Sequence, residues 1–255
     1  LGRCPIGGKD TVAVFPLQDT IPHRESPFVT WALIGLNVGV FLLELALPEP
    51  ALEALIRTFG VVPARYTEPG WMENPANYWP LLTNMFLHGG WMHIIGNMWT
   101  LWIFGDNVED RLGHGRYLVF YLLCGLAASG THILLHPDST IPAIGASGAI
   151  SGVMGAYFLL FPHSRIIAVF PVFFIPYFLE LPAVVYLGAW FLTQLFSGTF
   201  SILAPGTGGG IAWWAHIGGF LAGALLVRPM HRRRRRVYRP YFADEEIPIR
   251  YLYPR

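Results

Sequence analysis

Long apolar runs separated by polar or proline-rich segments dominate the hydrophobic pattern of the chain. A transmembrane helix needs about 20 predominantly apolar residues, since each residue of an α-helix advances about 1.5 Å along the axis. Six runs come close to that requirement, although the second is short. The expected spans cover residues 28–47, 90–104, 117–135, 143–161, 181–197 and 211–227. We therefore predict an all-α polytopic membrane protein, a six-transmembrane-helix bundle whose membrane domain covers residues 28–228.

The segments between these spans differ in character. Residues 48–88 combine Pro, Trp and Glu, and aromatic residues at that density favour the headgroup level of a bilayer, so we predict a structured loop at the membrane interface. Residues 166–178 are apolar but interrupted by Pro171 and Pro176, which favours an interfacial segment over a crossing. The other connections are expected to be a polar tail at 1–27, a charged turn at 106–116, a glycine-rich loop at 198–210 and a basic tail at 229–255.

The composition agrees with a membrane protein. The chain is 53% hydrophobic and only 13% charged, whereas about 25% charged residues are typical of soluble domains. Its two cysteines cannot form a disulfide framework, and Cys124 lies in an apolar run as a small core residue.

Basic residues are distributed unevenly along the chain. Five consecutive arginines at 232–236 follow the last apolar run. Such a run could bind nucleic acid, but beside a span it is more often a lipid-facing flank, so we expect the lipid bilayer and no nucleic acid as a partner. With a cytoplasmic N-terminus, only Arg57 and Arg65 of the 17 Lys and Arg residues lie outside. We predict that both termini are cytoplasmic, in a bacterial or archaeal plasma membrane.

A hydroxyl among glycines marks the fourth expected span. Ser147 has Gly145 two residues before it and Gly148 directly after it, so a backbone or a substrate could approach closely. The alternative is helix packing, which small-residue runs usually serve. A second such run near the C-terminus carries His216, with Gly219 and Gly223 four residues apart on one helical face.

Spans two, four and six run in the same direction in this arrangement. His93, Asn97, Ser147 and His216 then lie roughly 5 to 10 Å below the outer ends of their helices. Polar side chains at that depth normally face a bundle interior or a watery cavity. We predict a dyad in which Ser147 is the nucleophile and His216 the base. His93 and Asn97, four residues apart, are suited to donate hydrogen bonds to an oxyanion.

The run LLTNMFLHGGWMHIIGNM at 81–98, the GASG box at 145–148 and the AHIGG box at 215–219 together closely resemble the rhomboid intramembrane serine proteases. The segment VEDRLG at 108–113 is also similar to that family's turn after span two. The resemblance covers residues 15–227, and the order and spacing of the boxes make it specific.

This resemblance implies a rhomboid bundle with a structured first extracytoplasmic loop, a serine endopeptidase activity without cofactor or metal, and transmembrane proteins as substrates. It implies that Ser147 and His216 are catalytic, and that His93, Asn97 and the Ser147 backbone amide line the oxyanion hole. His88 matches a recurrent family histidine and is expected to position span two.

Two positions depart from the family pattern. A usual Trp-Arg pair of the first loop is Trp79-Pro80 here. Ser151, one turn after the nucleophile, stands where some members carry an aromatic ring stacked on the histidine, and we expect this to loosen the orientation of His216.

Two other classes of protein remain open. A proteolytically inactive rhomboid-like protein would bind membrane clients without cutting them. A metal or proton transporter would use His88, His93, His132 and His216. No carboxylate or thiolate joins these histidines at depth and no HExxH motif occurs, so a zinc site is not expected. The sequence leaves the oligomeric state open.

Overall fold

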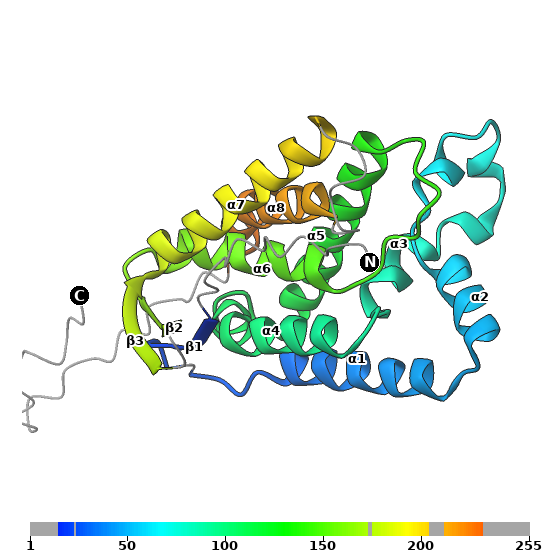
Figure 1. The fold of residues 1–255 in the computed structure, drawn as a ribbon. Coiled ribbons are helices and arrows are strands. Elements are labelled where there is room, and N and C mark those ends of the chain that lie inside the picture. Colours follow the sequence, from blue (N-terminus) through cyan, green and yellow to red (C-terminus); the bar gives the residue numbers. More distant parts are fainter. Residues whose placement is uncertain (1–14, 23, 173–174, 204–211, 232–255) are drawn as a thin grey trace, which may run out of the picture.

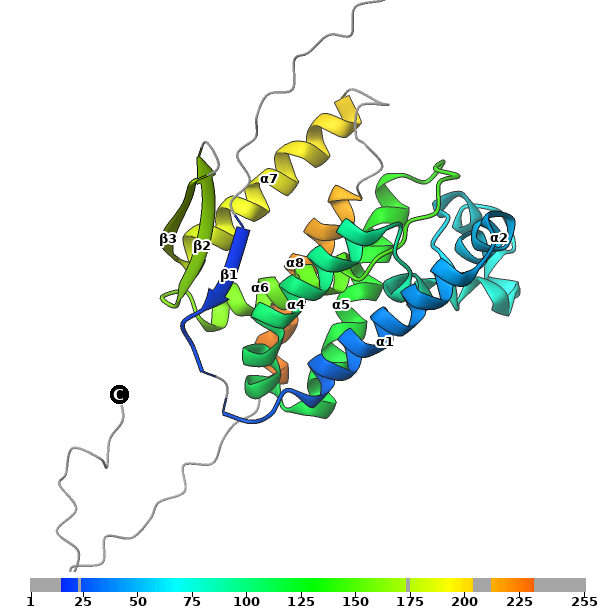
Figure 2. The same ribbon diagram turned by 60° about the horizontal axis from the view of Figure 1, so that its bottom comes forward.

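Helices packed around one central helix make up most of the protein (Figure 1). The computed structural model describes residues 15–22, 24–172, 175–203 and 212–231. Figures 1 and 2 show α6 in the middle of the molecule, with α4, α5 and α8 around it. The long helices are α1 (Phe28–Ala46), α4 (Trp91–Leu112), α5 (His114–Leu135), α6 (Ser147–Leu160), α7 (Ala183–Leu203) and α8 (Trp213–Met230).

Three of the described helices are long and apolar enough to cross a membrane: α1, α5 and the part of α7 from Ala183 to Ser201. The helix α6 is apolar but shorter, with 14 residues. Its length of about 21 Å falls short of a hydrocarbon core of about 30 Å. Exposed leucines such as Leu36 and Leu43 cover the outer face of α1. This pattern of buried helix and exposed apolar faces is that of a polytopic membrane protein.

The helix α4 is longer than the sequence pattern predicts. We expected a span over 90–104 and a charged turn over 106–116, but α4 continues to Leu112 and α5 follows directly. Gly113, with φ of 80°, makes the sharp break between the two helices. The prediction was wrong because a charged side chain of this segment, Glu109, is buried rather than solvated.

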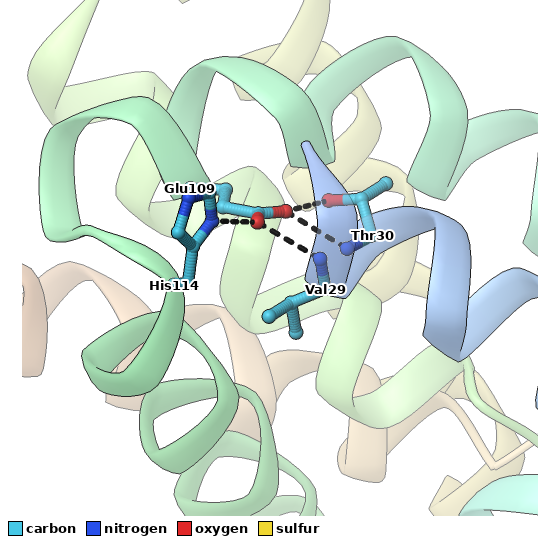
Figure 3. A network of polar contacts seen from close by, with 4 residues as sticks. All are labelled: Val29, Thr30, Glu109 and His114. Atoms are coloured by element: carbon cyan, nitrogen blue, oxygen red, sulfur yellow. Dashed lines mark hydrogen bonds and ion pairs between the residues drawn. The ribbon is translucent and has the colours of Figure 1, made fainter. Parts of the chain in front are cut away.

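Hydrogen bonds of the Glu109 carboxylate connect the start of α1 to the end of α4 (Figure 3). Its carboxylate accepts hydrogen bonds from the backbone N–H groups of Val29 and Thr30, at 2.9 and 2.8 Å, and from the Thr30 hydroxyl at 2.7 Å. Nδ1 of His114 lies 2.6 Å from Oε1, the carboxylate oxygen that also accepts from Val29. The first N–H groups of a helix have no partner within the helix, so this carboxylate satisfies donors of α1 that would otherwise be unpaired.

A small antiparallel sheet contradicts the all-α prediction. Its order is β1 (Phe15–Asp19), β2 (Arg165–Val172) and β3 (Ile175–Pro182). Residues 15–19 come from the expected tail, and β2 and β3 replace the expected interfacial segment at 166–178. The Ile, Val and Phe residues of β2 favour a strand. Its partner β1 is nearly 150 residues away along the chain, with Phe15 opposite Val169.

The strand β1 is held to the helices by polar contacts. Nε1 of Trp99 donates to the carbonyl of Pro16 at 2.6 Å, and Nδ2 of Asn107 donates to the Asp19 carboxylate at 2.8 Å. The Tyr157 hydroxyl also donates to Asp19. The sheet therefore lies at one end of the bundle, opposite α2 (Figure 1).

The last two helices also differ from their expected bounds. Because α7 runs to Leu203, residues 198–203 of the expected loop are helical. The helix α8 begins at Trp213 and extends three residues past the expected end, to Met230. The arginine run at 232–236 lies outside the described residues.

The segment between α1 and α4 is structured, as the sequence predicts. The hydroxyl of Tyr66 donates to the carbonyl of Asn77 at 2.9 Å, and that of Thr83 to the carbonyl of Phe59 at 2.8 Å. Trp79 is exposed. The segment consists of α2 (Glu49–Phe59), the 3-10 turns Pro63–Tyr66, Trp71–Glu73 and Pro75–Asn77, the short α3 (Pro80–Thr83) and a last 3-10 turn at Asn84–Phe86.

Candidate functional site

Ser147 begins the central helix α6. The sequence predicted a helix from residue 143, but Ala143 instead forms an isolated antiparallel bridge with Val61. Gly145 has φ of 124°, a backbone conformation that other residues rarely adopt and that a helix does not contain. The first N–H groups of a helix lack intrahelical partners. The backbone amide of Ser147 is therefore an available donor at the start of α6.

The side chains of Ser147 and His216 are in direct contact. Nε2 of His216 lies 2.8 Å from Oγ of Ser147, although the two residues are 69 positions apart in the chain. Both side chains are partly buried. This is the geometry in which an imidazole accepts the proton of a serine hydroxyl.

Glycines allow α6 and α8 to touch through their backbones. A Cβ atom added at Gly219 would collide with the carbonyl oxygen of Gly148, and one added at Gly223 would collide with that of Gly152. On its other side, Gly148 leaves only 2.6 Å between such an atom and Cβ of Ala128 on α5. This close approach of the two backbones brings Ser147 and His216 within hydrogen-bond distance.

His93 and Asn97 lie one turn apart on α4, beside the loop that precedes Ser147. A Cβ atom at Gly145 would be 2.5 Å from Nε2 of His93 and 3.7 Å from Nδ2 of Asn97. Nδ2 of Asn97 is buried and has no hydrogen-bond partner among the described residues. Nδ1 of His93 accepts from the N–H of Gly89 at 3.4 Å, which leaves Nε2 to carry the proton in the neutral ring. Two donors therefore lie beside Gly145, two residues before Ser147.

A residue of α7 that the sequence analysis did not identify contacts the second nitrogen of His216. Oε1 of Gln194 lies 2.8 Å from Nδ1 of His216, and Gln194 is 95% buried. The available signal was a lone amide side chain in a strongly apolar helix, which in a membrane protein is functional by default.

Position 151 provides no ring beside His216, and Ser151 bonds to its own helix. Oγ of Ser151 donates to the backbone carbonyl of Ser147 at 2.6 Å. The ring of Trp190 lies 6.0 Å from that of His216 between centroids, and the ring of Trp213 lies at 6.4 Å. The neighbours of the His216 ring come instead from α7 and α8, as the rings of Trp190 and Trp213 and the side chain of Gln194.

His88 packs against His93 at the start of α4. The two rings meet edge to face with centroids 5.1 Å apart, and His88 is almost fully buried. Both carboxylate oxygens of Glu44, on α1, lie 3.3 Å from the backbone nitrogen of His88. Glu44, which was not among the predicted site residues, ties the start of α4 to α1.

A small cavity of about 30 Å³ adjoins Ser147. Its polar lining includes Asn84, Ser129 and His132. Nδ2 of Asn84 donates to the hydroxyl of Ser129 at 3.2 Å. A polar cavity of this size has room for about one or two water molecules. In the described part of the chain, no group of three His, Cys, Asp or Glu residues has an arrangement that could hold a metal ion.

Comparisons with known proteins assign this architecture to a family. The model of the Rhomboid domain matches residues 75–233. Rhomboid protease GluP of Bacillus subtilis is 34% identical over 135 residues, which are 52% of this chain and 25% of GluP. Rhomboid protein 1, mitochondrial, of Saccharomyces cerevisiae is 28% identical over 207 residues, 77% of this chain and 51% of the yeast protein.

A further relative aligns over more of its own length. Rhomboid protease GlpG of Klebsiella pneumoniae is 25% identical over 229 residues, 87% of this chain and 70% of GlpG. The chain thus spans a quarter of GluP and about half of the yeast relative.

Proposed function

The chain belongs to the rhomboid family, and on that premise we propose that it is an intramembrane serine endopeptidase that cleaves membrane-spanning segments of other proteins. The observation that carries the proposal is the 2.8 Å contact between Oγ of Ser147 and Nε2 of His216 at the start of a short, buried central helix. Family membership implies membrane substrates in general. The cleaved segment and the two-residue mechanism are our inference.

In the proposed reaction, Oγ of Ser147 attacks the carbonyl carbon of the scissile peptide bond while Nε2 of His216 takes the hydroxyl proton. The histidine then gives that proton to the leaving amine as the C–N bond breaks, which leaves an acyl-enzyme. A water molecule, deprotonated by the same nitrogen, then attacks the ester carbonyl. The C–O bond to Ser147 breaks, Oγ takes the proton back from His216, and the second product leaves as a carboxylic acid. The cavity beside Ser147 offers space for such water within the protein.

The proposed oxyanion hole consists of three donors: the backbone amide of Ser147, Nε2 of His93 and Nδ2 of Asn97. The unpaired amide of Asn97 and the proton placed on Nε2 of His93 support this role. Donors fixed in advance stabilise the charge that develops in the transition state, and losing one typically lowers the rate about 10²- to 10³-fold.

We further propose six membrane-crossing helices, α1, α4, α5, α6, α7 and α8, within a membrane domain at 28–228, and cytoplasmic termini. Arg57 belongs to α2 and Arg65 to the turn that follows it, whereas Arg165 begins β2 of the sheet, and the sheet and α2 lie at opposite ends of the bundle. Because Arg111 and Arg116 flank the connection from α4 to α5 on the cytoplasmic side of this topology, the distribution supports an inside location for the sheet. In this orientation Ser147 is below the outer surface, because α6 is too short to span the bilayer alone. A helical substrate must unwind locally to expose its peptide bond there.

The alternative is a rhomboid-like protein that binds membrane clients without cutting them. The intact contact between Ser147 and His216 favours the protease. The test is to incubate the purified protein in detergent with a single-span model substrate and to identify products by mass spectrometry. We expect cleavage by the wild type and none by Ser147→Ala. Client binding by both proteins without cleavage would support the alternative.

A further inference from the structure

One polar side chain of α7 reaches the site formed by α6 and α8. Gln194 is 95% buried in a helix whose outer face carries exposed Leu192, Phe196 and Phe200. A buried amide is costly in such a setting unless its donors and acceptor are satisfied. Its contacts therefore indicate what it does.

The hydrogen bonds of Gln194 determine which way its side-chain amide is turned. Its Nε2 donates to the carbonyl of Trp190 at 3.4 Å and to Oγ1 of Thr193 at 3.2 Å, and that hydroxyl itself donates to the carbonyl of Trp190 at 2.6 Å. Turning the amide around would place its oxygen against these oxygen atoms. The amide nitrogen must therefore face its own helix, which leaves Oε1 to face Nδ1 of His216 at 2.8 Å.

An amide oxygen can only accept a hydrogen bond, so the proton of the neutral His216 ring must be on Nδ1. Nε2 then carries the lone pair that faces Oγ of Ser147. We propose that Gln194 is the positioning residue of the catalytic histidine: it holds the ring in the tautomer and orientation that serine activation requires. This inference rests on the proposed protease function and adds α7 to the residues that build the site.

A neutral amide suits this place better than a carboxylate would. When His216 takes the proton of Ser147, the amide dipole stabilises the imidazolium without an ionised group that must be desolvated in the resting enzyme. The titratable side chains that interact electrostatically with His216 are His93 of α4 and His132 of α5. Neither is an acid that could take the place of Gln194.

The test compares three variants with the wild type on the model substrate. Gln194→Leu keeps the volume but removes the acceptor, and we expect kcat to fall about 10- to 100-fold with KM nearly unchanged, because an unpaired Nδ1–H is costly and the other tautomer becomes populated. Gln194→Glu restores the acceptor, and the rotatable Thr193 hydroxyl can turn to donate to its second oxygen, so kcat should recover to within about threefold of wild type. Its carboxylate stabilises the imidazolium, so the acidic limb of the pH profile should move to higher pH.

Thr199→Val, on the exposed side of α7, is the matched control and should behave as wild type.

A second measurement does not depend on activity. In ¹⁵N-histidine NMR, His216 of the wild type should show a protonated Nδ1 and an unprotonated Nε2, and Gln194→Leu should show a mixture. Full activity of Gln194→Leu, or equal loss in the Glu variant, would overturn the inference and leave the protease proposal intact. A wild-type His216 protonated on Nε2 would overturn the inference and would also contradict the proposed proton transfer from Ser147 to that nitrogen. A wild type without cleavage would instead overturn the proposed function, while the NMR result would still decide the role of Gln194.

Discussion

Gly219 of α8 lies directly against the carbonyl oxygen of Gly148 on α6, with no space for a side chain between the two helices. The backbones are therefore in contact one residue after Ser147 and about one turn after His216. Without a hydrophobic driving force between helices in lipid, this close packing supplies much of the attraction. The same contact thus determines both the stability of the bundle and the distance within the proposed dyad.

Gly219→Val should lose most of the activity and lower the thermal midpoint, because the added atoms must push α8 away from α6. A displacement of even 1 Å can lower a rate about 10²-fold. Substrate cleavage and thermal unfolding in detergent measure the two effects.

The matched control is Gly39→Val on α1, where a Cβ atom meets nothing within 4 Å. It should keep activity and stability near those of the wild type. If Gly219→Val also behaved like the wild type, the two helices would not be in contact at this point.

Asn97→Ala should lower kcat about 10²- to 10³-fold and change KM little, because its amide would meet charge that develops only in the transition state. His93→Ala should follow the same pattern. Steady-state kinetics over a range of substrate concentrations separates the two parameters. A raised KM with unchanged kcat would instead make these side chains substrate-binding groups.

The apolar pattern was sufficient to locate the helices that face lipid. The expected span at 28–47 matches α1 (Phe28–Ala46), because both lipid exposure and burial select apolar residues. The pattern failed at Glu109, since a buried carboxylate that accepts hydrogen bonds from another helix looks like part of a polar turn in the sequence. It also failed for β1, whose only cue is a pairing with residues about 150 positions away.

The sequence indicated which residues belong to the candidate site better than it indicated how they are arranged. Ser147 and His216 stand out because glycines surround them in apolar runs. That Ser147 begins its helix depends on the positive φ of Gly145, which the composition of the run does not reveal. Gln194 was missed because the role we propose for it depends on a contact with His216, which lies 22 residues further along the chain on another helix.

Glu109→Ala should destabilise the protein by at least about 2 kcal/mol, since it leaves the buried N–H groups of Val29 and Thr30 without an acceptor. Equilibrium unfolding in mixed detergent micelles measures the change. The control is Glu53→Ala, which breaks an exposed pair with Arg57 and should cost less than about 1 kcal/mol. Equal effects of the two changes would show that Glu109 does not anchor α1.

Stability should depend on pH through Asp19 of β1. Burial raises the pKa of this carboxyl from 3.8 to about 6, although the hydrogen bond from Tyr157 opposes the shift and the charge of Asp106 adds to it. The folded protein thus binds this proton more tightly than the unfolded chain. The resulting stabilisation is complete below about pH 4 and is lost as the pH rises through about 6.

Asp19→Asn removes this titration. The thermal midpoint of the wild type should therefore fall relative to that of the variant between pH 4.5 and pH 7.5. Parallel curves for the two proteins over this range would mean that Asp19 titrates alike in the folded and unfolded states.

The most direct test of the proposed dyad is to treat the purified protein with a fluorophosphonate and to map the adduct by mass spectrometry. These reagents label a serine whose hydroxyl is activated by a base. We predict a single adduct on Ser147 in the wild type, and a rate of labelling that falls by at least about 10³-fold in His216→Ala, because the two residues act as a unit. Labelling of another serine, or unchanged labelling of Ser147 without His216, would contradict the assignment.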